Sequence, residues 1–197
     1  MSEVKGQVEV VEEEEERLDP EREARRRAAL AQVRQYPDPV LRMRANEVEA
    51  FDDALGSLVE RMIALMQEAA GVGLAAPQLG ILQRVFVYQV GEDPAVALVN
   101  PTIPASSDER ETASEGCLSL AASSVVVDVE RPLQVTVEAV TPAGEPVRID
   151  AEGLVARVVQ HELDHLDGVL TIDRTSPEQR REALAQLRPQ PVLGPLA

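Results

Sequence analysis

The residues best suited to chemistry lie in two short motifs. The chain has two histidines, His161 and His165, within residues 160–165 (Gln-His-Glu-Leu-Asp-His), and one cysteine, Cys117, within residues 115–119 (Glu-Gly-Cys-Leu-Ser). In a helix, the two histidines lie one turn apart on one face, about 6 Å along the axis, so both imidazoles can reach one ion. Glu162 lies beside them, where metallohydrolases place a carboxylate that moves protons. The pattern predicts a metal site on a helix.

The helix that carries the histidines is expected to be largely buried. Its apolar positions are Val155, Val158, Val159, Leu163 and Leu166. Burying two imidazoles and two carboxylates among them without partners would be costly, and a metal ion supplies the missing partner. The alternative is a pair of histidines on a solvent-exposed helix, which the apolar pattern disfavours.

The third metal ligand separates several classes of protein. A catalytic divalent site needs about three protein ligands and one open position for water. In one metalloprotease class a glycine and a third histidine follow, but here Gly168 is followed by Thr171 at that histidine's position. In another class a downstream glutamate is the ligand, and Glu178 and Glu182 are the candidates. Cys117 is the better candidate, because a thiolate with two imidazoles suits zinc or ferrous iron. The alternative for Cys117 is an inert buried side chain.

Composition excludes several functions. The 197 residues suggest one domain, and their net charge of -16 argues against a nucleic-acid binder or a basic membrane-surface protein. A single cysteine favours a reducing compartment. The amino terminus has no apolar stretch typical of a signal peptide, and no segment approaches 18 consecutive apolar residues. We therefore expect a cytoplasmic protein without direct nucleic-acid specificity.

The remaining sequence predicts an α+β fold. Apolar residues recur at helical spacing over 51–69, and helices are also expected over 21–33, 153–166 and 177–187. Valine-rich segments 84–90, 95–99, 125–129, 133–140 and 146–149 are typical of strands, with a hairpin turn at 142–144. We expect mostly antiparallel sheets packed around a central metal-binding helix, with an N-terminal and a C-terminal helix.

The chain is expected to divide into three regions. Residues 1–30 are interpreted as an acidic extension that is disordered or partly helical, because Glu12 to Glu16 repel one another. Residues 31–188 would form a single catalytic domain, and residues 189–197 a flexible tail.

Three motifs resemble those of the peptide deformylases, in the same order and with suitable separations. They are residues 71–78 (Gly-Val-Gly-Leu-Ala-Ala-Pro-Gln), 115–119 and 160–168. The resemblance runs from about Val33 to Asp173. It implies a metal-dependent hydrolase that removes the N-formyl group from the formyl-methionine of nascent polypeptides and releases formate.

The resemblance also implies a role for each site residue. One divalent ion, with water as its fourth ligand, would be held by Cys117, His161 and His165. Glu162 would take a proton from the attacking water and deliver it to the departing amine. The Gln78 side-chain amide and the Leu118 backbone N–H would stabilise the oxyanion.

Substrate contacts are implied around the first motif. In the family, backbone of this loop pairs with an extended peptide, and Gly73 is the expected contact. Gly71 and Gly73 would let the chain pass close to the substrate, although a loop that ends a helix would explain Gly71 equally well. The methionine pocket is expected from Val72, Leu118 and Val158.

Behind the ligands, Glu115 and Asp164 are expected to orient them or to bind backbone. The ligand set accepts iron, zinc, nickel or cobalt, and the resemblance suggests ferrous iron in cells. Some relatives contact the ribosome transiently, and Arg180 and Arg181 are candidates for this, although a solvated surface is the simpler interpretation.

The sequence departs from the family after Ser119. Bacterial members often have a proline two residues later and an arginine shortly beyond, but residues 120–125 are Leu-Ala-Ala-Ser-Ser-Val. This puts in doubt any substrate contact made by that arginine. Two alternatives stay open: another metallohydrolase, which would consume unformylated peptides, and a noncatalytic metal-binding module, which would need neither Glu162 nor Gln78.

Overall fold

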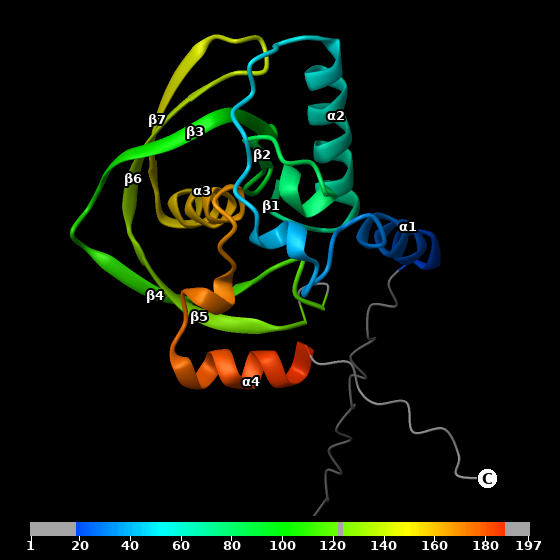
Figure 1. Ribbon diagram of the computed structural model, residues 1–197, viewed down its shortest axis with the longest axis vertical. Coiled ribbons are helices and arrows are strands. Elements are labelled where there is room, and N and C mark those ends of the chain that lie inside the picture. Colours follow the sequence, from blue (N-terminus) through cyan, green and yellow to red (C-terminus); the bar gives the residue numbers. More distant parts are fainter. Residues whose placement is uncertain (1–18, 122–123, 188–197) are drawn as a thin grey trace, which may run out of the picture.

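Two antiparallel sheets surround one helix in the computed structural model, which describes residues 19–121 and 124–187 (Figure 1). The larger sheet has the strand order β1 (Gly73–Ala75), β2 (Val85–Tyr88), β3 (Val96–Ser106), β6 (Gln134–Val140) and β7 (Pro146–Glu152). The smaller sheet pairs β4 (Arg110–Gly116) with β5 (Val126–Pro132). The helices are α1 (Pro20–Leu30), α2 (Asp53–Glu68), α3 (Gly153–Leu166) and α4 (Pro177–Leu187). The predicted α+β class is confirmed.

Helix α3 lies at the centre of the molecule (Figure 1). It begins directly after β7 at Gly153, whose φ of 57° turns the chain into the helix. Ala156, Val159 and Leu166 are fully buried against side chains of the larger sheet such as Phe86. The helix has the predicted bounds. Its packing against the sheet fixes the positions of the site residues that it carries.

All five predicted strand segments are present, but β1 was not predicted and β4 carries little strand signal. The three residues of β1 are too few to show a pattern, and β4 (Arg-Glu-Thr-Ala-Ser-Glu-Gly) has one buried side chain, that of Glu115. The partner strand β5 supplies the apolar contribution, because Val127 and Val129 point inward at alternate positions. Strand β4 therefore depends on pairing rather than on its own residues.

The chain ends of the described region are helical. Helix α1 begins at Pro20, capped by Asp19, and its buried Ala29 packs near α2. Helix α4 packs against β5 with Ala183 buried. Residues 1–18 of the expected extension and the expected tail 189–197 lie outside the described residues. Within the described ranges, no helix has the length and apolarity that a bilayer crossing requires.

Helix α2 ends in a Schellman motif that lacks the usual glycine. The Gly71 N–H donates to the Met66 carbonyl (2.9 Å) and the Ala70 N–H to the Gln67 carbonyl (3.1 Å). Ala70 has a φ of 56°, in the left-handed region. A side chain in that region costs about 1–2 kcal/mol, which glycine avoids.

Replacing Ala70 with Gly is therefore expected to raise the free energy of unfolding by about 1 kcal/mol. The matched control is Ala64→Gly, at an exposed position inside α2, which is expected to lower it by about 1 kcal/mol. Urea denaturation of the three proteins measures both changes. Destabilisation by Ala70→Gly would contradict the assigned cap.

Candidate functional site

Three potential metal ligands converge between α3 and the end of β4. Helix α3 supplies His161 and His165, and Cys117 follows β4 directly. Their ligand atoms all lie within 4.8 Å of one another, and the Cys117 Sγ is 3.2 Å from the His165 Nε2. Ligands of a tetrahedral ion lie about 3.5 Å apart, because each is about 2.0–2.3 Å from the metal. The donor set and its spacing fit a divalent ion.

The surroundings of the two rings shift their pKa values in opposite directions. Burial lowers the pKa of His161, but its hydrogen bonds with Cys117 and Glu115 outweigh burial and raise the pKa well above its usual value. Burial, together with the neighbouring His161, lowers the pKa of His165 well below its usual value. His165 is thus neutral, as a metal ligand must be, and its Nδ1 has no hydrogen-bond partner among the described residues.

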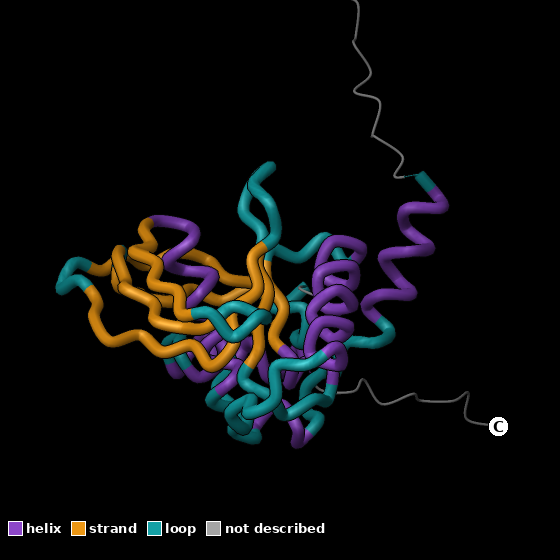
Figure 2. The backbone as a smooth tube through the Cα atoms, turned by 90° about the horizontal axis from the view of Figure 1, so that it is seen from above, coloured by secondary structure: helices purple, strands orange, loops and turns teal. Residues whose placement is uncertain are grey.

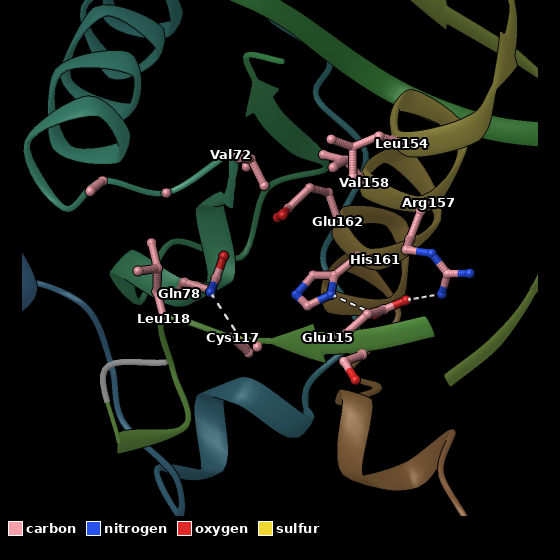
Figure 3. A pocket seen from close by; sticks show the side chains of 15 residues that line it. Val72, Gln78, Glu115, Cys117, Leu118, Leu154, Arg157, Val158, His161 and Glu162 are labelled. Carbon is pink, nitrogen blue, oxygen red and sulfur yellow. Dashed lines mark hydrogen bonds and ion pairs between the residues drawn. The ribbon is translucent and has the colours of Figure 1, made fainter. Parts of the chain in front are cut away.

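Glu115 fixes the orientation of His161. Its Oε2 lies 3.0 Å from the His161 Nδ1, which leaves the other ring nitrogen, Nε2, available for a metal (Figure 3). Burial raises the pKa of Glu115, but hydrogen bonds from His161 and Arg131 outweigh it and lower the pKa to about 2. Glu115 is therefore a permanent carboxylate that accepts the His161 N–H.

Two arginines bind this carboxylate, and a third belongs to the same network through Asp164. Arg131 binds Glu115 through Nε (2.6 Å) and Nη2 (2.9 Å), and its Nη1 reaches Asp164 (2.9 Å). Arg157 donates to Glu115 (2.9 Å), and Arg174 donates to Asp164 (2.6 Å). In the described part of the chain, Asp164 contacts none of the ligands and reaches Glu115 only through Arg131. This buried network ties β4, β5 and α3 together.

None of these arginines was predicted as a site residue, although two of them leave a signal in the sequence. Arg131 occupies the next inward position of β5 after Val127 and Val129, where an apolar residue is expected. Arg157 precedes His161 by four residues, so it lies on the same helix face. An arginine at a position that the pattern predicts to be buried needs a buried partner of opposite charge. These two arginines therefore indicate an acidic side chain near the histidines.

Glu162 lies against Gly73, where no side chain fits. A Cβ on Gly73 would lie 2.7 Å from the Glu162 Cδ, and a Cβ on Gly71 would lie 2.9 Å from the Leu118 Cδ1. Neither glycine has a positive φ, so any restriction at these positions comes from space rather than from backbone conformation; it is tight at Gly73, whereas at Gly71 the atom met is the far end of a flexible side chain. Burial raises the pKa of Glu162 to about 7, and its Oε2 has no partner among the described residues. The carboxylate is free to meet a small molecule.

Gln78 presents its amide nitrogen to the same place. Its Oε1 accepts from the Ala75 N–H (2.8 Å), and its Nε2 donates to the Ser119 Oγ (3.1 Å) and lies 3.8 Å from the Cys117 Sγ. These contacts determine which end of the amide faces the ligands. Ser119, the last residue of its motif, had no predicted role, and it orients Gln78.

One cavity of about 230 Å³ joins these groups (Figure 3). The predicted residues that line it are Gly71, Val72, Gly73, Gln78, Glu115, Cys117, Leu118, Val158, His161 and Glu162. Residues not predicted also line it: Ala70, Ser114, Gly116, Leu154 and Arg157. His165 and Asp164 lie behind its wall. The exposed side chains of Val72 and Leu154 give the cavity an apolar mouth.

Only part of the segment after Ser119, where the sequence departs from the family pattern, lies within the described residues. Leu120 is fully buried and Ala121 has a φ of 48°, while residues 122 and 123 lie outside the described residues. Leu120 belongs to the cluster that contains Cys117 and Leu170, so this end of the segment serves the core.

Comparisons with known proteins agree with this geometry. The family model described as polypeptide deformylase matches residues 30–181. The peptide deformylase of Natranaerobius thermophilus is 48% identical over 154 residues, which cover 78% of this chain and 97% of that protein. The crystal structure of the Thermotoga maritima peptide deformylase is 50% identical, has a TM-score of 0.71, and covers 74% of this chain and 97% of that one. The Synechococcus elongatus enzyme, solved with actinonin, is 40% identical with a TM-score of 0.75, covering 78% and 85%. This chain belongs to the peptide deformylase family.

Proposed function

We propose that this chain hydrolyses the N-formyl group from the formyl-methionine of nascent polypeptides and releases formate. The observation that carries the proposal is a single cavity lined by Glu162, Gln78, Cys117 and His161, with the third candidate ligand, His165, within 4.8 Å of the other two ligand atoms behind the cavity wall. A divalent ion held by the three ligands supplies a Lewis acid, which lowers the pKa of water and polarises a carbonyl.

Glu162 handles the protons in this proposal. Its carboxylate faces the cavity, has a free oxygen, and follows the ligand His161 directly. It takes a proton as water adds to the formyl carbon, and gives that proton to the amine as the C–N bond breaks. The Gln78 Nε2 and the Leu118 backbone N–H stabilise the negative charge that develops on the formyl oxygen.

The substrate backbone pairs with the free edge of β1. This strand is at the edge of the larger sheet, and the Val72 carbonyl accepts from the Gln89 N–H on the β2 side (2.9 Å). Because alternate residues of a strand face opposite edges, Gly73 directs its backbone N–H and carbonyl away from β2. Ala75 faces the same edge, where its N–H is already bound by the Gln78 Oε1 (2.8 Å). An extended peptide can add there as a strand, with its methionine side chain against Val158 and Leu118.

We further propose ferrous iron as the metal in cells, although zinc, nickel and cobalt suit the same donors. A thiolate ligand makes such a site sensitive to oxidation. We place the enzyme in the cytoplasm, where nascent chains are made. Transient ribosome contact through α4 has less support, because Arg180 is already paired with Asp173 (3.2 Å).

The test is formate release from formyl-Met-Ala-Ser by protein loaded anaerobically with ferrous iron. We expect metal-dependent formate release and no cleavage of unformylated Met-Ala-Ser in a parallel reaction. Cleavage of the unformylated peptide would instead indicate a peptidase. A metal-loaded protein that releases no formate would refute the proposal.

Arg157 is expected to set the geometry of the ligands. It joins α3 to the Glu115 carboxylate and to the Val129 and Glu111 carbonyls, each at 2.9 Å. Its replacement by Ala should free Glu115 and α3 to shift and should weaken metal binding about 10–100-fold. Arg157→Lys should restore part of the affinity.

Zinc titration against a chromophoric chelator measures the affinity independently of turnover. The matched control is Arg148→Ala, whose guanidinium is exposed and pairs with Glu138 (3.1 Å) far from the cavity. That variant should bind zinc as the wild type does. Unchanged affinity in Arg157→Ala would show that the ligands hold their positions without it.

A further inference from the structure

Helix α1 is largely an addition to the family domain. The family match begins at residue 30, whereas α1 spans Pro20–Leu30. The helix lies beside the C-terminal end of α2 (Figures 1 and 2). Between them is a groove of about 510 Å³, lined by Arg22, Glu23, Arg25, Arg26, Gln67, Glu68 and Ala70. A helix added to the family domain beside the active site can provide an additional binding surface.

The groove carries uncommitted positive charge. Arg22, Arg25 and Arg26 share the helix face of the buried Ala29, and none forms an ion pair within residues 19–121 and 124–187. Glu23 and Glu68 also line the groove, which leaves an excess of one positive charge. In a chain of net charge -16, this is an unusual local balance that favours an anionic ligand.

The groove adjoins the active-site cavity. Ala70 lines both, and the loop through Gly71 and Val72 leads from the groove into β1. Strand β1 runs toward Gln78, so a formyl group beside Gln78 and Glu162 lies at the inner end of the cavity. A peptide on the free edge of β1 must leave by the open mouth at Val72, antiparallel to β1. Its later residues then pass Ala70 and reach the groove.

We propose that the α1–α2 groove binds acidic side chains of the substrate polypeptide beyond about its third residue. Formylated chains with Asp or Glu in that region are thereby preferred. This inference rests on the proposed deformylation, since it extends the same substrate along the same path.

The test compares formyl-Met-Ala-Ser-Gly-Gly-Glu-Glu-Glu with the peptide in which the three glutamates are glutamines. At low ionic strength we expect the acidic peptide to have a KM about three- to tenfold lower, with kcat unchanged. The difference should disappear in about 0.5 M salt, because the screening length falls to a few ångströms. Wild-type turnover of formyl-Met-Ala-Ser, which is too short to reach the groove, separates failure of this inference from failure of deformylation.

Two charge-matched variants locate the effect. Arg26→Glu changes a groove residue and should abolish the preference for the acidic peptide. Arg27→Glu changes an exposed residue of the same helix outside the groove, and it should keep most of the preference. Equal losses in both would indicate a general charge effect and overturn the inference. Absence of any preference would also overturn it. A preference that appears only after Glu12 to Glu16 are changed to Gln would overturn it as well, because the chain's own N-terminal segment would then be the ligand of the groove.

Discussion

Replacing Glu162 with Gln is expected to lower the kcat for formate release by about 10²–10⁴-fold while the metal ligands stay in place. The amide has nearly the same size as the carboxylate, so it fits the space beside Gly73. It cannot take a proton from water, so both proton transfers lose their carrier. Metal content, measured on the same sample as kcat, distinguishes a lost proton carrier from a lost ion.

Glu178→Gln is the matched control for this experiment. Glu178 is an exposed carboxylate of α4 and is one of the downstream glutamates weighed as a third ligand. Its replacement should change neither metal content nor kcat. Loss of metal from Glu178→Gln would refute the Cys117 ligand set, and wild-type kcat in Glu162→Gln would refute the proposed proton carrier.

The proximity of the two histidines was predictable because its signal is local and the residue type is rare in this chain. Both histidines lie on one helix, and helical geometry alone places them on one face. The bounds of α3 were predicted for the same reason, since its apolar positions repeat regularly. Cys117 is different, because it is 44 residues before His161; the chemistry of a thiolate with two imidazoles made it the better candidate for third ligand, and the resemblance supported that choice.

What could not be predicted depends on contacts between distant segments. The ion pairs of Arg131 with Glu115 and Asp164 join β5, β4 and α3. No local sequence pattern shows which arginine pairs with which carboxylate. Strand β1 is short, and it matters because it lies at the edge of the larger sheet. Only the order of the strands in that sheet shows this. The two glycines were interpreted as letting the chain pass close to substrate, with a helix end as the alternative for Gly71; the structure adds that a Cβ at either position would meet a side chain of the site, and that Gly71 also belongs to the cap of α2.

The clearest test of that revised interpretation is Gly73→Ala, which is expected to lower kcat by about 10²-fold or more. The new Cβ would lie 2.7 Å from the Glu162 Cδ and 2.9 Å from its Cγ, with Oε1 closer still. The carboxylate must therefore move from its place beside the ligands. Gly71→Ala is the matched control, because its Cβ meets the far end of the Leu118 side chain, which can rotate away.

The double variant Gly73→Ala/Glu162→Gln decides whether the glycine acts through Glu162. If it does, the double variant should be no slower than the slower single variant, because one proton carrier can be lost only once. Additive losses would show that Gly73 serves the substrate backbone separately, as the free edge of β1 would allow. Metal content should stay at the wild-type level in all three variants, since neither residue is a ligand. If the losses of kcat are non-additive and the metal content is unchanged, Gly73 is needed because it leaves room for the Glu162 carboxylate that moves the proton.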